Sequence, residues 1–339
     1  MSRTVAFTQQ ATNVFCHILT ACNLRCRHCY INPAQHGDAT RSRTTIRAWL
    51  AEILSRCPDP AAANLVLLGG EPTLHPDLAG IIRDARGLGY GSITIDTNGY
   101  LFHDILDRLA PGEVDYFSFS LDGPDPETND PIRGDGSFDR CTDGIRAAVR
   151  KGVATSLICT VSRENIGALD RMPTLVRDLG VDRFFIQVIG IRGQSAGAGD
   201  RLQLSRDEWF YAVPPAAWAA AEAGITVTYP KVFLDPGETF QCAGIAADNY
   251  FIFPNGRVYR CPLCEDYPLH SLRFDDAGRL VSTPRINEAD LFRLSIPEGC
   301  VMNQLIQPDN IDYHADGTPR HRVACCLLKT EIRGNRAGG

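Results

Sequence analysis

Two hydrophobic periodicities alternate along the first 190 residues. Short runs rich in β-branched and aromatic residues, each ending in a turn, predict strands at Val14–Leu19, Asn64–Leu68, Ser92–Asp96, Tyr116–Leu121, Ala154–Val161 and Arg183–Ile189. Between them, apolar residues at spacings of three and four predict helices near Thr44–Ser55, Pro76–Leu88, Leu101–Leu109, Phe138–Lys151 and Gly167–Leu179. This alternation indicates parallel strands joined by right-handed crossovers, with the chemistry in loops at the carboxyl ends of the strands.

The pattern changes after residue 190. Gly190–Gly199 is rich in glycine and is expected to be mobile, and a helix over Ser205–Ala223 is expected to be interrupted at Pro214-Pro215. From about Glu238 the chain is irregular, with a hairpin-like Tyr250–Cys261, and we expect metal rather than a core of its own to staple it. The predicted organisation is an N-terminal extension (1–13), a barrel with a connecting segment (14–237) and a small cysteine-rich module with a tail (238–339).

Charge and apolar content exclude several classes of protein. The chain has 339 residues and a formal net charge of −6, so it has no basic surplus for binding nucleic acid. No run of about 18 apolar residues and no apolar segment near the N-terminus occur, which speaks against membrane spanning and secretion. The expected location is the cytoplasm.

Cysteine is unusually abundant, with 13 residues in two clusters and four scattered positions. In a long chain without an export signal, clustered thiols indicate metal binding rather than disulfides. Cys22, Cys26 and Cys29 lie on one loop directly after the first strand. Three thiolates can bind three irons of a cubane cluster and leave the fourth open for a reacting ligand. Zinc is the alternative, with His28 as the fourth ligand, although that position is cramped.

Cys22-x3-Cys26-x2-Cys29 followed by the aromatic Tyr30, on the loop after the first strand, resembles the radical S-adenosylmethionine (SAM) superfamily. The resemblance implies a partial (β/α)6 TIM-like barrel, a 4Fe-4S cluster whose open iron binds SAM, and cleavage of SAM to a 5′-deoxyadenosyl radical. It also implies an electron donor such as flavodoxin or ferredoxin.

Further segments match the family in order and position. By resemblance, the ends of successive strands would contact SAM. Near the methionine moiety would lie Gly69, Gly70, Glu71 and Pro72, and near the ribose and carboxylate would lie Thr97, Asn98, Ser120 and Asp122, with Arg133 on the carboxylate. Tyr30 would lie against the adenine, with Gln187 and Ile189 on its other side. Singly, each of these has an ordinary structural explanation. Together, four segments at successive strand ends favour the family.

The C-terminal cysteines resemble the SPASM and twitch extensions of this family. Cys242, the Asn255-Gly256 turn and Cys261 resemble the opening of an auxiliary 4Fe-4S site. Six cysteines suffice for one cluster, which favours the twitch-like arrangement. We predict Cys242, Cys261 and Cys264 as ligands, with Cys300, Cys325 or Cys326 as the fourth; we choose Cys300 and assign Cys326 as a hydrogen-atom donor. A zinc knuckle on Cys261 and Cys264 is the alternative.

The resemblance implies hydrogen-atom abstraction but names no substrate. The cluster loop begins at Cys22, which leaves no room for a preceding peptide-recognition domain. We therefore favour a small polar metabolite, such as a sugar, aminocyclitol or nucleoside, and its dehydrogenation or epimerisation. The alternatives are decarboxylation of a sugar-nucleoside acid, maturation of a ribosomal peptide, and a non-catalytic iron–sulfur carrier. Glu238, Asp248, Glu265 and Asp266 could bind an aminosugar, but exposed surface carboxylates are the simpler interpretation.

Overall fold

The computed structural model describes residues 4–5, 11–197 and 202–334. Its core is a curved sheet whose strands run in the order β11-β10-β9-β8-β1-β2-β3-β4-β5-β6-β7-β12. The six strands predicted from the sequence are present, in order, as β1 (Thr12–His17), β2 (Ala63–Leu68), β3 (Ser92–Thr97), β4 (Tyr116–Ser120), β5 (Thr155–Val161) and β6 (Arg183–Val188). All neighbours from β1 to β6 pair in parallel, which confirms the partial barrel.

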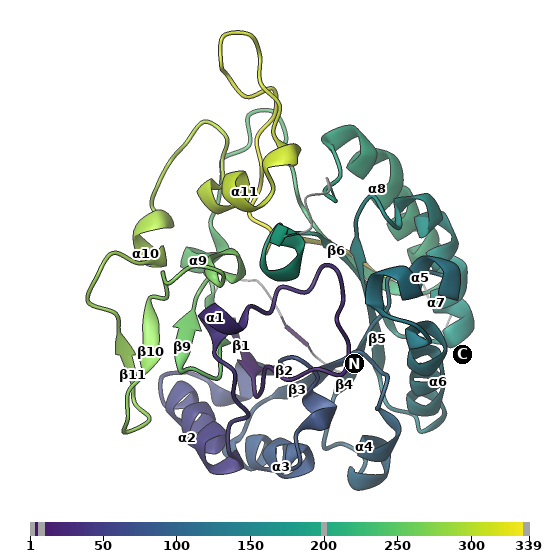
Figure 1. The fold of residues 1–339 in the computed structure, drawn as a ribbon, viewed down its shortest axis with the longest axis vertical. Coiled ribbons are helices and arrows are strands. Elements are labelled where there is room, and N and C mark those ends of the chain that lie inside the picture. Colours follow the sequence, from purple (N-terminus) through teal and green to yellow (C-terminus); the bar gives the residue numbers. More distant parts are fainter. Residues whose placement is uncertain (1–3, 6–10, 198–201, 335–339) are drawn as a thin grey trace.

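Helices cover the outer face of the strand ring (Figure 1). They are α2 (Arg43–Leu54), α3 (Leu78–Leu88), α4 (His103–Arg108), α5 (Pro126–Arg133), α6 (Ser137–Arg150), α7 (Met172–Leu179) and α8 (Arg206–Glu222). The residues of β5 and β6 that face these helices, such as Leu157 and Phe184, are fully buried. The alternate residues, such as Thr160 and Gln187, keep partial exposure. The inner face of the sheet is therefore only partly covered, whereas its outer face is buried under the helices.

The expected interruption of α8 is wrong, because one helix continues through Pro214 and Pro215. The prolines leave the carbonyls of Phe210 and Tyr211 without helical donors. Both residues are exposed, Tyr211 by 86%, so water can satisfy those carbonyls.

The C-terminal module is joined to the barrel, an arrangement that the sequence did not indicate. Its strand β8 (Asp248–Ile252) pairs in parallel with β1, and Phe251 stacks on Phe15 with 4.5 Å between ring centroids. The predicted hairpin is confirmed by the antiparallel pairing of β8 with β9 (Arg257–Tyr259). The sheet continues through β10 (Leu272–Phe274) and β11 (Leu280–Ser282). The module therefore extends the barrel's sheet and core.

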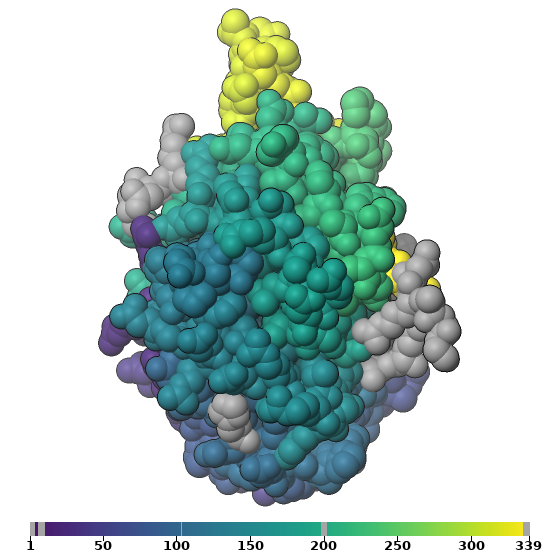
Figure 2. Space-filling view, turned by 90° about the vertical axis from the view of Figure 1, so that its right-hand side faces the viewer, coloured from purple at the N-terminus to yellow at the C-terminus, as the bar shows by residue number. Residues whose placement is uncertain are grey.

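The other edge of the sheet is also made late in the chain. Strand β7 (Thr226–Pro230) pairs in parallel with β6, and β12 (Lys329–Ile332) pairs antiparallel with β7. Short helices connect the module: α9 (Ala243–Ala246), α10 (Glu288–Leu291) and α11 (Val301–Ile306). Residues 312–321 form a hairpin that protrudes from the body (yellow in Figures 1 and 2). Within the described residues, no helix combines the length and apolar character that a membrane crossing needs.

Candidate functional site

The first cysteine loop runs from β1 to α1 (Pro33–His36) across the mouth of the strand ring (purple in Figure 1). Cys22 is exposed, Cys26 and Cys29 are half-buried, and all three are free thiols. Burial raises the pKa of the Cys26 thiol to about 11 against the opposing effect of Arg133. The sulfurs are close enough that the charges of Cys22 and Cys29 raise this pKa further. Three soft, mutually close thiols suit iron.

The Gly69–Pro72 loop holds the cysteine loop by its backbone. Gly70 donates its N–H to the Leu19 carbonyl at 3.0 Å, and Glu71 donates to Ala21 at 2.9 Å. A Cβ on Gly70 would lie 2.1 Å from the Ala21 oxygen, and one on Gly69 would lie 2.2 Å from the Leu19 oxygen. Only glycine permits this approach.

Glu71 is fully buried and joins this loop to the end of β3. Its Oε1 accepts from the hydroxyls of Thr73 and Thr97 at 2.6 and 2.8 Å, and its Oε2 accepts from the Asn98 N–H at 2.7 Å. Asn98 in turn donates to Asn23 at 2.9 Å and contacts the Cys22 sulfur at 3.7 Å. Two of the predicted strand-end segments, those after β2 and β3, therefore converge on the first cysteine.

Asp122 and Arg133 converge on the second cysteine. Arg133 Nε lies 2.6 Å from Asp122 Oδ2, and both side chains are buried. Although burial alone would raise it, the pKa of Asp122 is held well below its usual range by Arg133 and His28. His28 Nε2 lies 2.5 Å from the same carboxylate. Sequence reasoning considered His28 only as a zinc ligand, whereas the structure engages this nitrogen with Asp122.

The segment after β6 was expected to be mobile, but its described part (190–197) is tied to the first cysteine loop. Gln194 donates its N–H to the Cys29 carbonyl at 2.8 Å, and the Arg192 guanidinium covers the Tyr30 ring at 4.8 Å. His17 donates from Nδ1 to the Ile252 carbonyl, so its Nε2 accepts from the Tyr30 hydroxyl at 2.7 Å. Tyr30 is thus held by contacts that its sequence neighbourhood did not predict.

Arg192 also reaches the second cysteine cluster. Its Nη1 donates to Glu265 Oε2 at 2.7 Å and to the Pro262 carbonyl. Glu265 was taken for a surface carboxylate, but its side chain is only 2% exposed. Of the other three acidic residues, Asp248 is exposed, whereas Glu238 and Asp266 are partly exposed. The Arg192–Glu265 pair lies between the two cysteine regions and connects them.

Five of the six C-terminal cysteines line one internal cavity: Cys242, Cys261, Cys300, Cys325 and Cys326. Cys264 is buried next to Cys261. The thiols of Cys242 and Cys326 lie close enough to Cys325 to lower its pKa, a proximity that the sequence did not indicate. The buried Glu288 accepts the Cys261 N–H at 3.0 Å and the Arg260 N–H at 2.7 Å, so it fixes the start of the Cys261–Cys264 turn.

The donor chemistry of both thiol sets fits iron–sulfur clusters, because thiolates are the ligands of such clusters. Across the part of the chain that the structure describes, no three His, Cys, Asp or Glu side chains stand at the spacing of a bound metal ion. Loading therefore requires the thiols to lose protons and adjust their rotamers.

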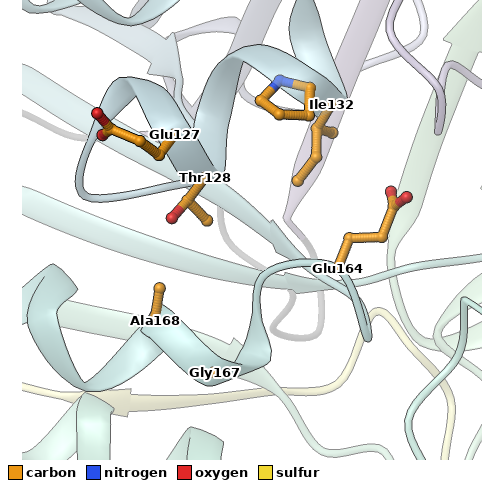
Figure 3. Close-up of a pocket in the computed structure, with 7 residues that line it drawn as sticks. Glu127, Thr128, Ile132, Glu164, Gly167 and Ala168 are labelled. Atoms are coloured by element: carbon orange, nitrogen blue, oxygen red, sulfur yellow. The ribbon is translucent and has the colours of Figure 1, made fainter.

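A surface pocket adjoins the first loop from outside (Figure 3). Glu127 and Thr128 come from α5, and Glu164 comes from the segment after β5. Arg27 of the cysteine loop pairs with Glu164 and donates its N–H to the Ile132 carbonyl. The pocket wall thus supports the outer side of the cysteine loop.

The inner face of the sheet carries an acid, Asp96, whose side chain is partly exposed. Burial raises the pKa of Asp96 to about 7, partly offset by a hydrogen bond from Ser118. A folded-state pKa above the unfolded value means that stability falls as pH rises between about 4 and 7. We expect Asp96→Asn to remove this dependence in the metal-free protein and to raise stability at pH 8 by up to roughly 4 kcal/mol.

Chemical denaturation of both proteins at pH 5 and pH 8 tests this. Surface-exposed Asp207→Asn is the matched control. Equal pH dependence in wild type and Asp96→Asn would contradict the assignment.

Comparison with known proteins agrees with this geometry. Residues 17–176 match the family described as the Radical SAM superfamily. The chain is 32% identical over 188 residues to pre-heme d1 synthase of Dinoroseobacter shibae, covering 53% of this chain and 44% of that protein. It is 30% identical over 168 residues to a probable GTP 3′,8-cyclase of Saccharolobus solfataricus, covering 49% and 53%. The chain thus spans about half the length of these relatives.

Solved structures share the fold at low identity. Streptococcus suis SuiB superposes with a TM-score of 0.59 at 15% identity, covering 75% of this chain and 61% of SuiB. Native anSMEcpe with bound AdoMet gives a TM-score of 0.59 at 13% identity, covering 78% and 77%. The family implies SAM and a 4Fe-4S cluster. By its cysteine loop, its partial barrel and its family match, the segment of residues 17–176 belongs to the radical SAM superfamily.

Proposed function

We propose that the protein reductively cleaves SAM and abstracts a hydrogen atom from a small polar natural product, giving net dehydrogenation or epimerisation. The observation that carries this proposal is the convergence of four strand-end segments on the loop of Cys22, Cys26 and Cys29. When bound there, the cluster supplies the electron that cleaves SAM to methionine and the 5′-deoxyadenosyl radical. The proposed domains are the barrel with its connecting segment (14–237) and the auxiliary module (238–339).

The strand-end residues would hold SAM by charge and close approach. We assign Glu71 and Arg133 to the amino and carboxyl groups of SAM, with Thr97, Asn98, Ser120, Asp122, Gln187 and Ile189 around the ribose and adenine. In the present structure Glu71 and Arg133 are satisfied by Thr97, Asn98 and Asp122. These partners keep both charges buried and oriented, which is the preorganisation that ligand binding requires.

A second cluster in the module is the next part of the proposal. Cys242, Cys261 and Cys264 remain the proposed ligands with Cys300, and the contact between Cys325 and Cys242 makes Cys325 a competing fourth ligand. Cys326 is half-buried in the cavity wall, and we assign it as the thiol that returns a hydrogen atom in epimerisation. Dehydrogenation would instead require an electron acceptor.

The names of the relatives bear on the substrate class. The names of the two sequence relatives refer to GTP and to pre-heme d1, both small molecules, which favours a small substrate. SuiB has been solved bound to its precursor peptide, so peptide maturation is the alternative. Binding of a leader peptide would favour that alternative, and its absence would favour the small molecule.

The decisive assay incubates the reduced, anaerobically reconstituted protein with SAM and measures 5′-deoxyadenosine. None formed, with or without candidate substrates, would favour an iron–sulfur carrier. With a substrate in D2O, epimerisation places one solvent deuterium in the product, whereas dehydrogenation places none.

Replacing Cys242 by Ala distinguishes the role of the second thiol set from that of the first. We expect the variant to cleave SAM without coupling to product, and its iron content to fall from about eight to about four per chain. Cys57→Ala, at a half-buried thiol that donates to the Ile53 carbonyl, is the control. Iron near four in the wild type itself would eliminate the second cluster.

A further inference from the structure

We propose that Lys329 is a binding site for an anionic oxygen group, a carboxylate or phosphate, of the substrate that lies against the inner face of the barrel sheet. This inference rests on the proposed function, because it names the substrate class of the same site.

The strand register places Lys329 on the inner face of the sheet. Phe185 of β6 pairs with Thr228 of β7, and Thr228 pairs with Glu331 of β12. Side chains two residues apart on a strand share a face, so Lys329 lies on the same face as Phe185. The Lys329 Nζ is 4.7 Å from the Phe185 ring centroid, which agrees with the register.

This side of the barrel is lined by groups that could contact a polar substrate. Gln187 follows Phe185 by two residues on β6 and pairs with Thr160 of β5. Both are partly exposed on this inner face. Cys325 and Cys326 of the second thiol set are also close enough to Lys329 for their charges to act on its ammonium. The ammonium therefore lies near both the barrel wall and the second thiol set. A substrate that contacts these two regions would pass close to it.

The charged groups around Lys329 leave its ammonium without an ion-pair partner in the part of the chain that the structure describes. The neighbouring charges on this wall neutralise each other, because Arg183 pairs with Glu331 at 2.7 Å. Among the described residues no carboxylate lies within ion-pair distance of Lys329, and its acidic neighbours are the two thiols. A lysine directed into an interior without a partner is uncommon, and an anionic ligand would supply the missing charge.

The test is calorimetric titration of the reconstituted full chain with inorganic phosphate and, separately, with malonate, at constant ionic strength. We expect Lys329→Met to weaken binding of the preferred anion about tenfold or more, and Lys329→Arg to retain most of it. Lys151→Met removes a lysine that pairs with Asp107 on the exposed surface and is expected to bind as wild type does. Preference for phosphate or malonate distinguishes the two sources of the charge.

Three results would overturn the inference. Equal anion affinity in wild type and Lys329→Met excludes the site. If Lys329→Met loses as much affinity for SAM as for the anion, the lysine is assigned to SAM's own carboxylate. No anion binding in wild type, with a shifted cluster reduction potential in Lys329→Met, assigns it to the thiolates. Formation of 5′-deoxyadenosine by the wild type tests the proposed function separately, so the two failures are distinguishable.

Discussion

Cys26→Ala is expected to abolish formation of 5′-deoxyadenosine. Cys26 is the central thiol of a set of three, and it lies beside Arg133, whose carbonyl its sulfur contacts at 3.8 Å. Two remaining thiols cannot hold a cluster that must leave one iron open. The measurements are 5′-deoxyadenosine by chromatography and iron per chain after anaerobic reconstitution, with an expected loss of about four irons.

Cys159→Ala provides the matched control for this variant. Cys159 is a buried thiol on β5, so its loss tests whether removing any cysteine from the barrel destabilises the protein. We expect it to keep iron and SAM cleavage, at a small cost in stability. SAM cleavage by Cys26→Ala at the wild-type rate would refute the assignment of this loop.

Gly70→Ala should produce the largest loss of stability among single substitutions in the barrel loops. Its Cβ would stand 2.1 Å from the Ala21 oxygen and 2.4 Å from the Thr20 oxygen, and neither backbone group can rotate away. We expect destabilisation of about 3 kcal/mol, measured by chemical denaturation of the metal-free protein. Displacement of the cysteine loop should also lower iron uptake.

Gly87→Ala shows whether this effect is specific. Gly87 lies within α3, and an added Cβ would have no heavy atom within 4 Å. Alanine should therefore leave stability unchanged or raise it by roughly 0.5–1 kcal/mol. A stable Gly70→Ala protein with normal iron uptake would show that the loop tolerates displacement.

The sequence predicts the barrel well because its strands and helices have clear periodicities. The turn at Asn255-Gly256 was likewise readable, and Gly256 has a φ of +82°. The strands β7 and β12 were missed, since short edge strands carry little pattern of their own. β8 was found as a hairpin strand, but nothing local to it indicates that its partner is β1, more than 200 residues earlier.

The site was predictable only where residues follow one another on a loop. Their spacing alone identifies Cys22, Cys26 and Cys29 as a ligand set. Arg192 and Glu265, in contrast, are 73 residues apart and meet only after folding. The same applies to Cys325, which lies close to Cys242 in the cavity. It applies also to Lys329, which meets the Phe185 ring only after folding. Spacing rules detect local ligand sets but not partners that tertiary packing supplies.

The parallel pairing of β1 with β8 restricts how this architecture can be cut and recombined. Deleting everything from residue 238 onward would remove β8, one of the two neighbours of β1. The backbone amide and carbonyl groups of β1 that pair with β8 would then be unpaired beside Phe15. Exposed edges of that kind recruit other chains into intermolecular sheets. Exchange of the module between homologues must therefore carry the whole β8–β11 ribbon with it, or the truncated barrel will aggregate.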